Sequence, residues 1–321
     1  MKFIALLLTF VYTGIGCFAQ QKYFEGSLVY RSSVKSKIDN LSDKDAQKVL
    51  AAGDVRTVAV KNGNYRQTSE YADVFTIRKD KKAYIKFRKI DTLYYLDYAF
   101  DTSRVMGVVK SDSVLKVNNY LCKSITIKTS NSTKRYYYSD SLRNNPVYDQ
   151  DNTIDQYNLY SRETGGAMYL LTRSEYTFAV QTDSCTRIEQ KSIDDHVFDL
   201  PALPLKDLST ASLHSIARFP GKEGAWLKYL ESNLDSKLGI KYIKLPKGQS
   251  EASATVLVEF IVAEDGTISN IQVLNKNAVH PRLAEEAVRV IKESPRWVPA
   301  NFYGEKITSS CRQPIVFKVM Q

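Results

Sequence analysis

The histidines and cysteines that could carry out nucleophilic or metal chemistry are few and widely spaced in this chain. Its three histidines, His196, His214 and His280, stand far apart, and none lies at a metal-ligand spacing from a cysteine. The densest polar group is Asp194-Asp195-His196, and no G-x-S-x-G or H-E-x-x-H sequence accompanies it. Catalysis needs partners that converge on one point. We therefore predict no catalytic residue, no metal site and no cofactor, in a protein that is not an enzyme.

The first residues predict export. Lys2 precedes an apolar run at 3–11, and Cys17 and Ala19 are small residues at the two positions that a signal peptidase reads. The run is shorter than the roughly 20 residues that span a bilayer. We expect residues 1–20 to be a cleaved signal peptide. Two alternatives stay open, which are lipidation of Cys17 and retention of the segment as an anchor.

Cleavage would leave three cysteines, Cys122, Cys185 and Cys311. An odd number in an oxidising compartment allows at most one pair. Cys122 and Cys185 both lie in strand-like runs, so we expect a disulfide between them. The alternative is that all three are buried as small apolar side chains.

The formal net charge is +10 at pH 7. The charges are scattered, as in Lys79-Asp80-Lys81-Lys82, which indicates a solvated basic surface rather than a nucleic-acid groove. We expect no nucleic-acid partner. A basic surface favours anionic partners such as lipid headgroups or acidic glycans.

Residues 21–204 read as short strands separated by turn residues such as Asn62-Gly63. One helix is expected at 42–52, where Ser42 and Asp45 form a capping pair. The sequence therefore predicts a mostly antiparallel β domain at 21–204.

A linker is expected at 205–218, and a small second domain at 219–321. In that domain, residues 255–263 alternate in polarity and Asp265-Gly266 supplies a tight turn before a second strand. Apolar residues at helical spacing follow Pro281, an earlier apolar stripe lies at 226–234, and a last strand contains Ile315 and Phe317. The expected fold class is α+β, with two helices on a three-stranded antiparallel sheet in this domain.

The last third of the chain resembles the TonB C-terminal domain in the form common among Bacteroidota. The matching residues are Phe219-Pro220-Gly221, Asp265-Gly266, Pro295-Arg296-Trp297-Val298-Pro299-Ala300, Gly304 and Pro314-Ile315-Val316-Phe317. The resemblance implies a periplasmic domain that pairs its exposed last strand with an extended peptide, the TonB box of an outer-membrane transporter. The candidate binding residues are Thr308, Ser310, Arg312, Val316 and Lys318. An unused edge, or an edge paired with a second copy in a homodimer, is the alternative.

Residues 21–204 resemble the GLPGLI group of exported Bacteroidota proteins. The matching residues are the strand at 24–30, Cys122-Lys123, Tyr137-Tyr138-Ser139-Asp140 and Phe198-Asp199-Leu200-Pro201. Such domains look like the open half-barrel of lipoprotein carriers, whose concave face can hold an acyl chain. The many tyrosines suit a groove of that kind, and cross-strand packing is the alternative.

Residues 201–218, which include the linker, span at most roughly 60 Å when fully extended, which is too short for an energy transducer that crosses the periplasm. We therefore expect a non-enzymatic periplasmic binding protein associated with the outer membrane. It would dock an outer-membrane transporter or another envelope component, such as lipid or peptidoglycan, by edge-strand pairing. One alternative is a carrier of a hydrophobic ligand in the N-terminal domain. The other is a TonB-family energy transducer, if the N-terminal segment is retained.

Overall fold

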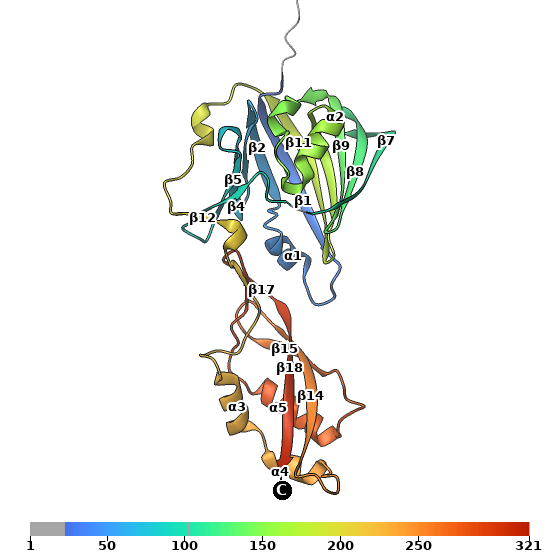
Figure 1. Cartoon of the computed structure of the whole chain (residues 1–321), viewed down its shortest axis with the longest axis vertical. Helices are drawn as coiled ribbons and strands as arrows, with labels where there is room; N and C mark the ends of the chain where they lie inside the picture. Colours follow the sequence, from blue (N-terminus) through green and yellow to red (C-terminus); the bar gives the residue numbers. More distant parts are fainter. Residues whose placement is uncertain (1–22, 102, 321) are drawn as a thin grey trace, which may run out of the picture.

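The computed structural model describes residues 23–101 and 103–320. The expected signal peptide and Cys17 lie outside these ranges. A large curved sheet with its helices occupies one end of the molecule, and a smaller set of strands and helices occupies the other (Figure 1). No described helix is long and apolar enough to cross a bilayer.

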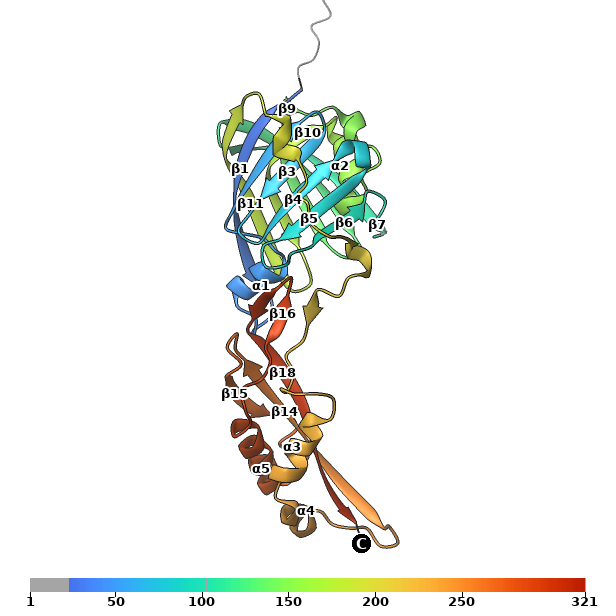
Figure 2. The same cartoon turned by 90° about the vertical axis from the view of Figure 1, so that its left-hand side faces the viewer.

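The large sheet has 12 strands in the order β12-β6-β5-β4-β3-β2-β1-β11-β10-β9-β8-β7. The strands are β1 (Gly26–Ser36), β2 (Val55–Lys61), β3 (Asn64–Thr68), β4 (Ala72–Ile77), β5 (Lys82–Phe87), β6 (Leu93–Asp97), β7 (Val105–Val117), β8 (Tyr120–Thr129), β9 (Thr133–Arg143), β10 (Ala167–Glu175), β11 (Ala179–Gln190) and β12 (Leu205–Asp207). All neighbours are antiparallel except β12 and β6. The sheet is open, with β12 and β7 as its edges, and it curves strongly (Figure 2). The predicted antiparallel β architecture is confirmed.

Short helices accompany this sheet. They are α1 (Asp43–Val49), α2 (Tyr157–Thr164), η1 (Arg78–Asp80), η2 (Pro146–Asp149), η3 (Ile154–Gln156), η4 (Asp195–Phe198) and η5 (Leu208–Thr210). The Ser42 side chain caps α1 by accepting from the backbone N–H of Asp45, as expected. The helix α2 was not predicted from the sequence, because its buried positions are Tyr160, Ser161 and Thr164 rather than an aliphatic stripe.

The two faces of the sheet bury different sets of residues. Leu28, Val58 and Leu170 belong to one core cluster, which extends between β1, β2 and β10. Phe75 and Phe198 belong to another, where η4 and the chain after it pack against β4 and β5. Successive side chains of a strand point to opposite faces of the sheet, so one strand can contribute residues to both core clusters.

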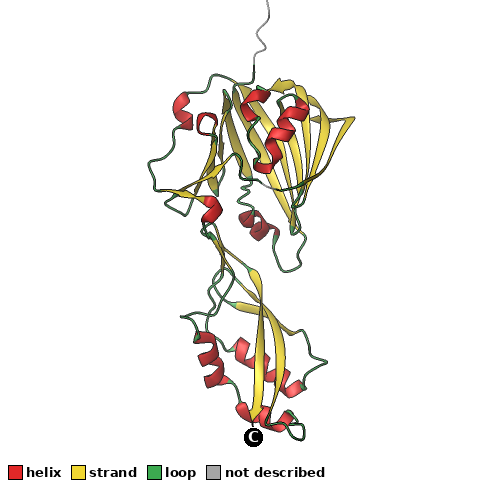
Figure 3. Cartoon of the chain, viewed as in Figure 1, coloured by secondary structure: helices red, strands yellow, loops and turns green. Residues whose placement is uncertain are grey.

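The C-terminal part contains two small sheets and three helices. The first sheet is antiparallel in the order β15-β14-β18, and the second has the order β13-β16-β17. The strands are β13 (His214–Ser215), β14 (Glu251–Val262), β15 (Ile268–Val273), β16 (Ala300–Phe302), β17 (Glu305–Ile307) and β18 (Ser309–Met320), and the helices are α3 (Ala225–Asn233), α4 (Ser236–Tyr242) and α5 (Pro281–Lys292). These helices pack against the long strands β14 and β18 (Figure 3). The predicted α+β class and three-stranded sheet are confirmed, and α4 is an additional helix.

The segment 205–218, expected as a linker, contains two short strands that pair with the rest of the protein. Strand β12 lies parallel to β6, and β13 lies antiparallel to β16. The segment is therefore held at both ends by backbone hydrogen bonds.

The hairpin β16–β17 contacts the large sheet. Its turn residue Tyr303 stacks on Phe87 with ring centroids 4.5 Å apart. The Nζ of Lys89 lies 2.6 Å from Oε2 of Glu305. Lys48 of α1 donates to the carbonyl of Lys306 (3.0 Å). Aromatic stacking and ion pairs thus join the two parts of the chain.

Candidate peptide-binding edge

The hairpin β14–β15 positions β18, because β18 pairs with β14. Asp265-Gly266 turns β14 into β15, and Gly266 adopts a positive φ of 84°. A Cβ at this glycine would lie 2.2 Å from the carbonyl oxygen of Trp297, so only glycine fits. The backbone N–H of Trp297 donates to Gly266 (2.9 Å). The turn and the segment that leads into β16 therefore fix each other.

Trp297 is a core residue rather than a contact surface. Its side chain is buried and its indole N–H donates to the Ser294 hydroxyl (3.0 Å). The rings of Phe219, Trp226 and Phe260 pack around it, with centroids within 5.7 Å. Trp297, with Ala300, Ile315 and Phe317 of the matching sequence, is thus buried in the interior of the domain.

The hydrogen bonds of β14 show which backbone groups of β18 face outward. Leu257 donates to the Asn275 side chain and accepts from the Leu274 N–H, both at 2.9 Å, so its backbone polar groups point toward β15. Leu257 pairs with Pro314 in an unbroken register. In an antiparallel ladder such a pair is not hydrogen-bonded, and the groups of Pro314 point away from β14.

The same alternation applies along the whole of β18. Backbone groups at every second position from Pro314 also face the open edge of the sheet. These positions are Ser310, Arg312, Val316 and Lys318. Thr308 lies between β17 and β18, just before the strand begins. The structure thus brings four of the five predicted binding residues to one edge, in one row.

Two features limit the open stretch of this edge. Pro314 has no N–H, so the middle of the row offers only an acceptor. At the far end, a Cβ on Gly239 of α4 would lie 3.5 Å from the carbonyl oxygen of Lys318, so α4 approaches the edge there. The freely accessible stretch therefore runs from Ser310 to Val316. The helix α4 was not predicted from the sequence, so this limit on the open edge was not predicted either.

The charged side chains of β18 are paired with β14. The Nε of Arg312 donates to Glu259 (2.7 Å), which also accepts from the Gln272 amide (2.8 Å). The hydrogen bond from Arg312 holds the pKa of Glu259 below its usual range. Lys318 lies 2.6 Å from Glu251. These pairs cross the sheet face and leave the backbone edge uncovered.

An apolar groove of about 480 Å³ follows this edge between β18 and the helices α3 and α4. Its apolar lining includes Trp226, Leu227, Leu230, Leu234, Pro314, Val316 and Phe317. Leu227 is 63% exposed and Val316 is 52% exposed, although both are large apolar side chains. The sequence indicated an apolar stripe on this helix, and part of that stripe lines the groove.

The cysteines do not form the expected pair. Cys122, Cys185 and Cys311 are all free and buried. Cys122 lies on β8 and Cys185 on β11, with β10 and β9 between them in the sheet. At about 4.8 Å per strand the two backbones are about 14 Å apart along the sheet, beyond the reach of a disulfide. Burial raises the pKa of the Cys185 thiol to about 11.

The polar group around His196 lies at the surface. The Nδ1 of His196 is 2.8 Å from a carboxylate oxygen of Asp199, and both side chains are exposed. This hydrogen bond raises the pKa of the imidazole above its usual value. Within the described ranges, no three histidine, cysteine, aspartate or glutamate side chains gather as a metal site.

Comparison with known proteins identifies one region of the chain. The family model for the C-terminal domain of the Gram-negative bacterial TonB protein matches residues 249–319. No curated protein matches the chain.

Several solved structures align with the chain, with low sequence identity and low TM-scores. PNGF-II, in its C2 and P21 crystal forms, shares 13% and 11% identity, with a TM-score of 0.37 in both cases. The overlaps cover 76% and 93% of this chain but only 44% and 65% of PNGF-II, less than two thirds of its length. A LolA superfamily protein from Nitrosomonas europaea shares 7% identity over 55% of this chain and 90% of its own, with a TM-score of 0.26.

The match to the family model covers the elements that build the open edge. It begins just before β14 and ends within β18, and it includes β15, α5 and the hairpin β16–β17. The TonB C-terminal family is non-enzymatic and envelope-associated. Residues 249–319 of this chain thus match the model of the TonB C-terminal domain.

Proposed function

We propose that this chain is a non-enzymatic periplasmic protein that docks an outer-membrane protein through the open edge of β18. The observation that carries the proposal is the row of outward-facing backbone groups at Ser310, Arg312, Pro314 and Val316. An extended segment of a partner can add to this row as a further antiparallel or parallel strand. Its main-chain hydrogen bonds supply affinity that depends little on the partner's sequence.

The groove beside β18 supplies selectivity. Alternate side chains of an added strand would point toward its apolar walls, among which Leu227 and Val316 are the most exposed. Burial of these side chains contributes roughly 25 cal/mol for each Å² of apolar surface removed from water. A partner segment with apolar residues at every second position fits this geometry best.

Pro314 places one condition on the partner. A residue opposite Pro314 can donate its N–H to the proline carbonyl, but its own carbonyl finds no donor there. That carbonyl must remain hydrated, or the partner strand must bend away at this point. The strongest pairing is therefore expected on either side of Pro314.

The partner class is an outer-membrane transporter or another envelope protein, in keeping with the TonB C-terminal domain. Thr308 and Lys318 lie beyond the two ends of the open stretch, and α4 restricts the partner's access at Lys318. A second copy of this chain is the competing occupant, because two open edges can pair with each other.

The test compares Val316→Pro with Val316→Ala in the full chain. The N–H of Val316 faces the open edge, so proline removes one outward donor without breaking a hydrogen bond to β14. Alanine removes the side chain and keeps the donor. We expect the wild type and Val316→Ala to retain a transporter from outer-membrane extract, identified by mass spectrometry, and Val316→Pro to lose it.

A synthetic peptide from the extended segment of that transporter then gives the affinity by calorimetry. Equal affinity of the wild type and Val316→Pro would contradict strand addition at β18. A dimer in the wild type that becomes a monomer in Val316→Pro, with no transporter bound by either, would assign the edge to self-pairing.

A further inference from the structure

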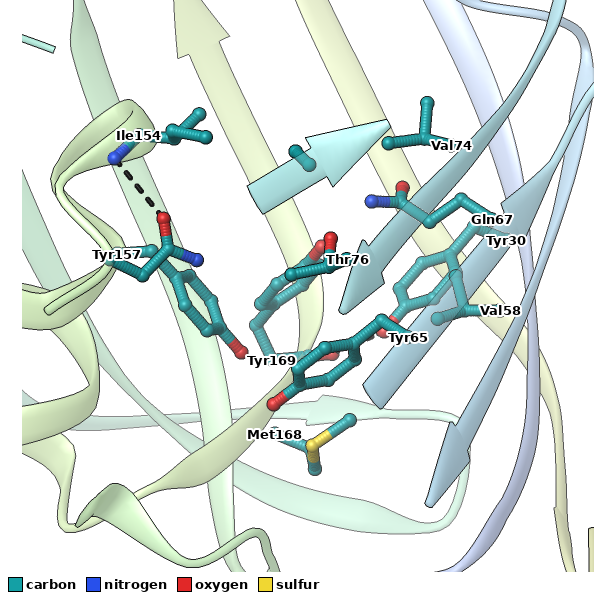
Figure 4. Close-up of a pocket in the computed structure, with 12 residues that line it drawn as sticks. Tyr30, Val58, Tyr65, Gln67, Val74, Thr76, Ile154, Tyr157, Met168 and Tyr169 are labelled. Atoms are coloured by element: carbon teal, nitrogen blue, oxygen red, sulfur yellow. Dashed lines mark hydrogen bonds between the residues drawn. The ribbon is translucent and has the colours of Figure 1, made fainter. Parts of the chain in front are cut away.

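The concave face of the large sheet is covered by its own side chains. Tyr65, Tyr157 and Tyr169 gather there around a cavity of about 160 Å³ (Figure 4). Ile125 and Ile127 of β8 are buried on the same face, in one cluster with tyrosines of α2. These side chains are turned inward, so they are not available to a surface that the protein meets from outside.

The edge strand β7 and its neighbour β8 expose large apolar side chains instead. Met106 is 62% exposed, Val109 is 66% exposed and Leu121 is 68% exposed. β7 has a neighbour on one side only, and it lies at the outer side of the sheet, away from the C-terminal part (Figure 1). A group of exposed apolar side chains indicates a surface that meets a protein or a membrane.

Two bulges make β7 a poor partner for another strand. Its register with β8 shifts between Val105 and Gly107 and again between Ser111 and Leu115. A bulge bends a strand and interrupts its row of outward backbone groups, which is one way in which natural sheets protect an edge. The exposed apolar side chains of β7 therefore suit a partner that needs no backbone pairing.

Positive charge is concentrated in the same part of the sheet. Residues 104–143, which include β7, β8 and β9, contain eight lysines and arginines and two aspartates. Their formal charge is thus +6, more than half of the +10 of the whole chain. Four of the basic side chains pair with the carboxylates of Asp140, Asp155 and Glu163. The other four are exposed and form no ion pair within the described ranges, and they are Arg104, Lys116, Lys128 and Arg135.

The strand register places basic and apolar side chains on one face. Val109 lies opposite Thr126, and Thr126 lies opposite Arg135. The Nε of Arg135 donates to the Thr126 hydroxyl (3.0 Å), so these two side chains share a face. Thr126 stands between the two buried isoleucines of β8, so this face is the convex one. Lys128, two residues farther along β8, points to the same side.

We propose that the edge and the convex face of β7, β8 and β9 bind the surface of a bilayer that contains anionic phospholipids. Met106, Val109 and Leu121 enter the boundary between the headgroups and the acyl chains. Lys128 and Arg135 contact the phosphate groups, whose negative charge complements this part of the sheet. Water in the headgroup region hydrates the open backbone groups of β7.

An acidic glycan would complement the same charge but not the apolar side chains. Such a polymer is strongly hydrated, so it would leave Val109 and Leu121 in water. A bilayer surface removes these side chains from water and neutralises the basic ones at the same time. The pairing of exposed apolar and basic side chains therefore favours the bilayer.

The first test measures binding of the full chain to vesicles by flotation. One vesicle type is pure phosphatidylcholine, and the other also contains phosphatidylglycerol. We expect binding to the anionic vesicles only, weakened by added salt. A Lys128→Gln, Arg135→Gln double variant should bind about ten- to thirtyfold more weakly, at about fivefold for each basic side chain. The matched control is Lys206→Gln, Lys276→Gln, which changes the net charge equally at two exposed positions elsewhere and should bind as the wild type does.

The second test examines the apolar contact. Val109→Ser and Leu121→Ser should each weaken binding to anionic vesicles by roughly tenfold, because each removes an apolar side chain that the bilayer covers. Val109→Trp should show fluorescence that brominated phospholipids quench. Ile216→Ser and Ile216→Trp are the controls, since Ile216 is 82% exposed and lies in the segment before the C-terminal part. Neither control should change binding or show quenching beyond that of the wild type.

The outcomes that would overturn the proposal differ in what they assign. Equal binding of the wild type to both vesicle types, or binding to neither, would exclude an anionic bilayer surface. Full binding by a folded Lys128→Gln, Arg135→Gln variant, or no quenching of Val109→Trp, would place the contact elsewhere on the chain. Binding to soluble polygalacturonate that is as tight as binding to the vesicles would assign the basic face to acidic glycans. A dimer without vesicles that Val109→Ser converts to a monomer would assign the apolar side chains to a second copy.

This surface is separate from the open edge of β18. Val316→Pro should therefore bind anionic vesicles as the wild type does, whatever its effect on the docking of an outer-membrane protein. Loss of vesicle binding by a folded Val316→Pro variant would show that the membrane contact lies at β18 and would refute the site at β7.

Discussion

Asp149 is a buried carboxyl group whose ionisation should control how stability changes with pH. It is 2% exposed, and burial raises its pKa to about 7. The hydroxyl groups of Tyr65 and Ser161 approach it only at 3.4 Å, so hydrogen bonding offsets little of the cost of desolvating its charge. Asn144 donates to the same Tyr65 hydroxyl.

The sign and size of the effect follow from this raised pKa. Between the unfolded pKa near 4 and the folded pKa near 7, the native state binds more protons than the unfolded state, so stability falls as the pH rises. Each pKa unit corresponds to about 1.4 kcal/mol, which gives a total loss of about 4 kcal/mol above pH 7. Asp149→Asn keeps the shape of the side chain and cannot ionise, so it should abolish this loss.

The measurement is the free energy of unfolding by urea from pH 4.5 to pH 8. Asp149→Asn should match the wild type near the acidic end and exceed it by about 3–4 kcal/mol at pH 8. The control is Asp151→Asn, two residues away, whose half-exposed carboxylate pairs with Lys81. A difference between Asp149→Asn and the wild type that does not vary with pH, or that shrinks as the pH rises, would refute the reasoning.

Three further predictions concern backbone and interface positions. Gly266→Ala should lower the free energy of unfolding in urea by at least about 2 kcal/mol more than Gly248→Ala does. Both glycines have a positive φ, but only a Cβ at Gly266 would clash, with the carbonyl oxygen of Trp297. Equal losses of stability in the two variants would contradict this. Tyr303→Ala should cost about 1–3 kcal/mol of unfolding free energy and Tyr303→Phe almost nothing, since the stacked ring rather than the hydroxyl contacts Phe87; equal effects would exclude the stacking contact. In circular dichroism melts, Ile315→Pro should unfold the C-terminal part, whereas Val316→Pro should stay folded. Of these two residues, only Ile315 donates its N–H to β14. Similar melting of the two variants would contradict the assigned hydrogen-bond ladder.

The parts of the fold that local patterns determine were predictable from the sequence. The Asp265-Gly266 turn needs a positive φ, and Pro281 suits the first position of a helix, so the hairpin and α5 follow from a few residues. The helix α4 was not predicted, because Gly239 at its centre lowers helix propensity. Its sequence also shows no continuous apolar stripe.

The parts that depend on contacts distant in sequence could not be read from local patterns. The expected Cys122–Cys185 pair failed because two strands lie between β8 and β11, and strand order is a property of the whole sheet. The row of binding residues in β18 was predicted from a resemblance, but the limit imposed by α4 needed the structure.

The most direct test of strand addition is amide hydrogen exchange in β18, measured by NMR with and without the partner peptide. In the free protein, Cys311 and Ile315 should exchange slowly because they donate to β14, and Arg312 and Val316 should exchange quickly at the open edge. Peptide binding should slow Arg312 and Val316 and leave the other two unchanged. If the peptide binds while Arg312 and Val316 still exchange quickly, strand pairing at β18 is contradicted.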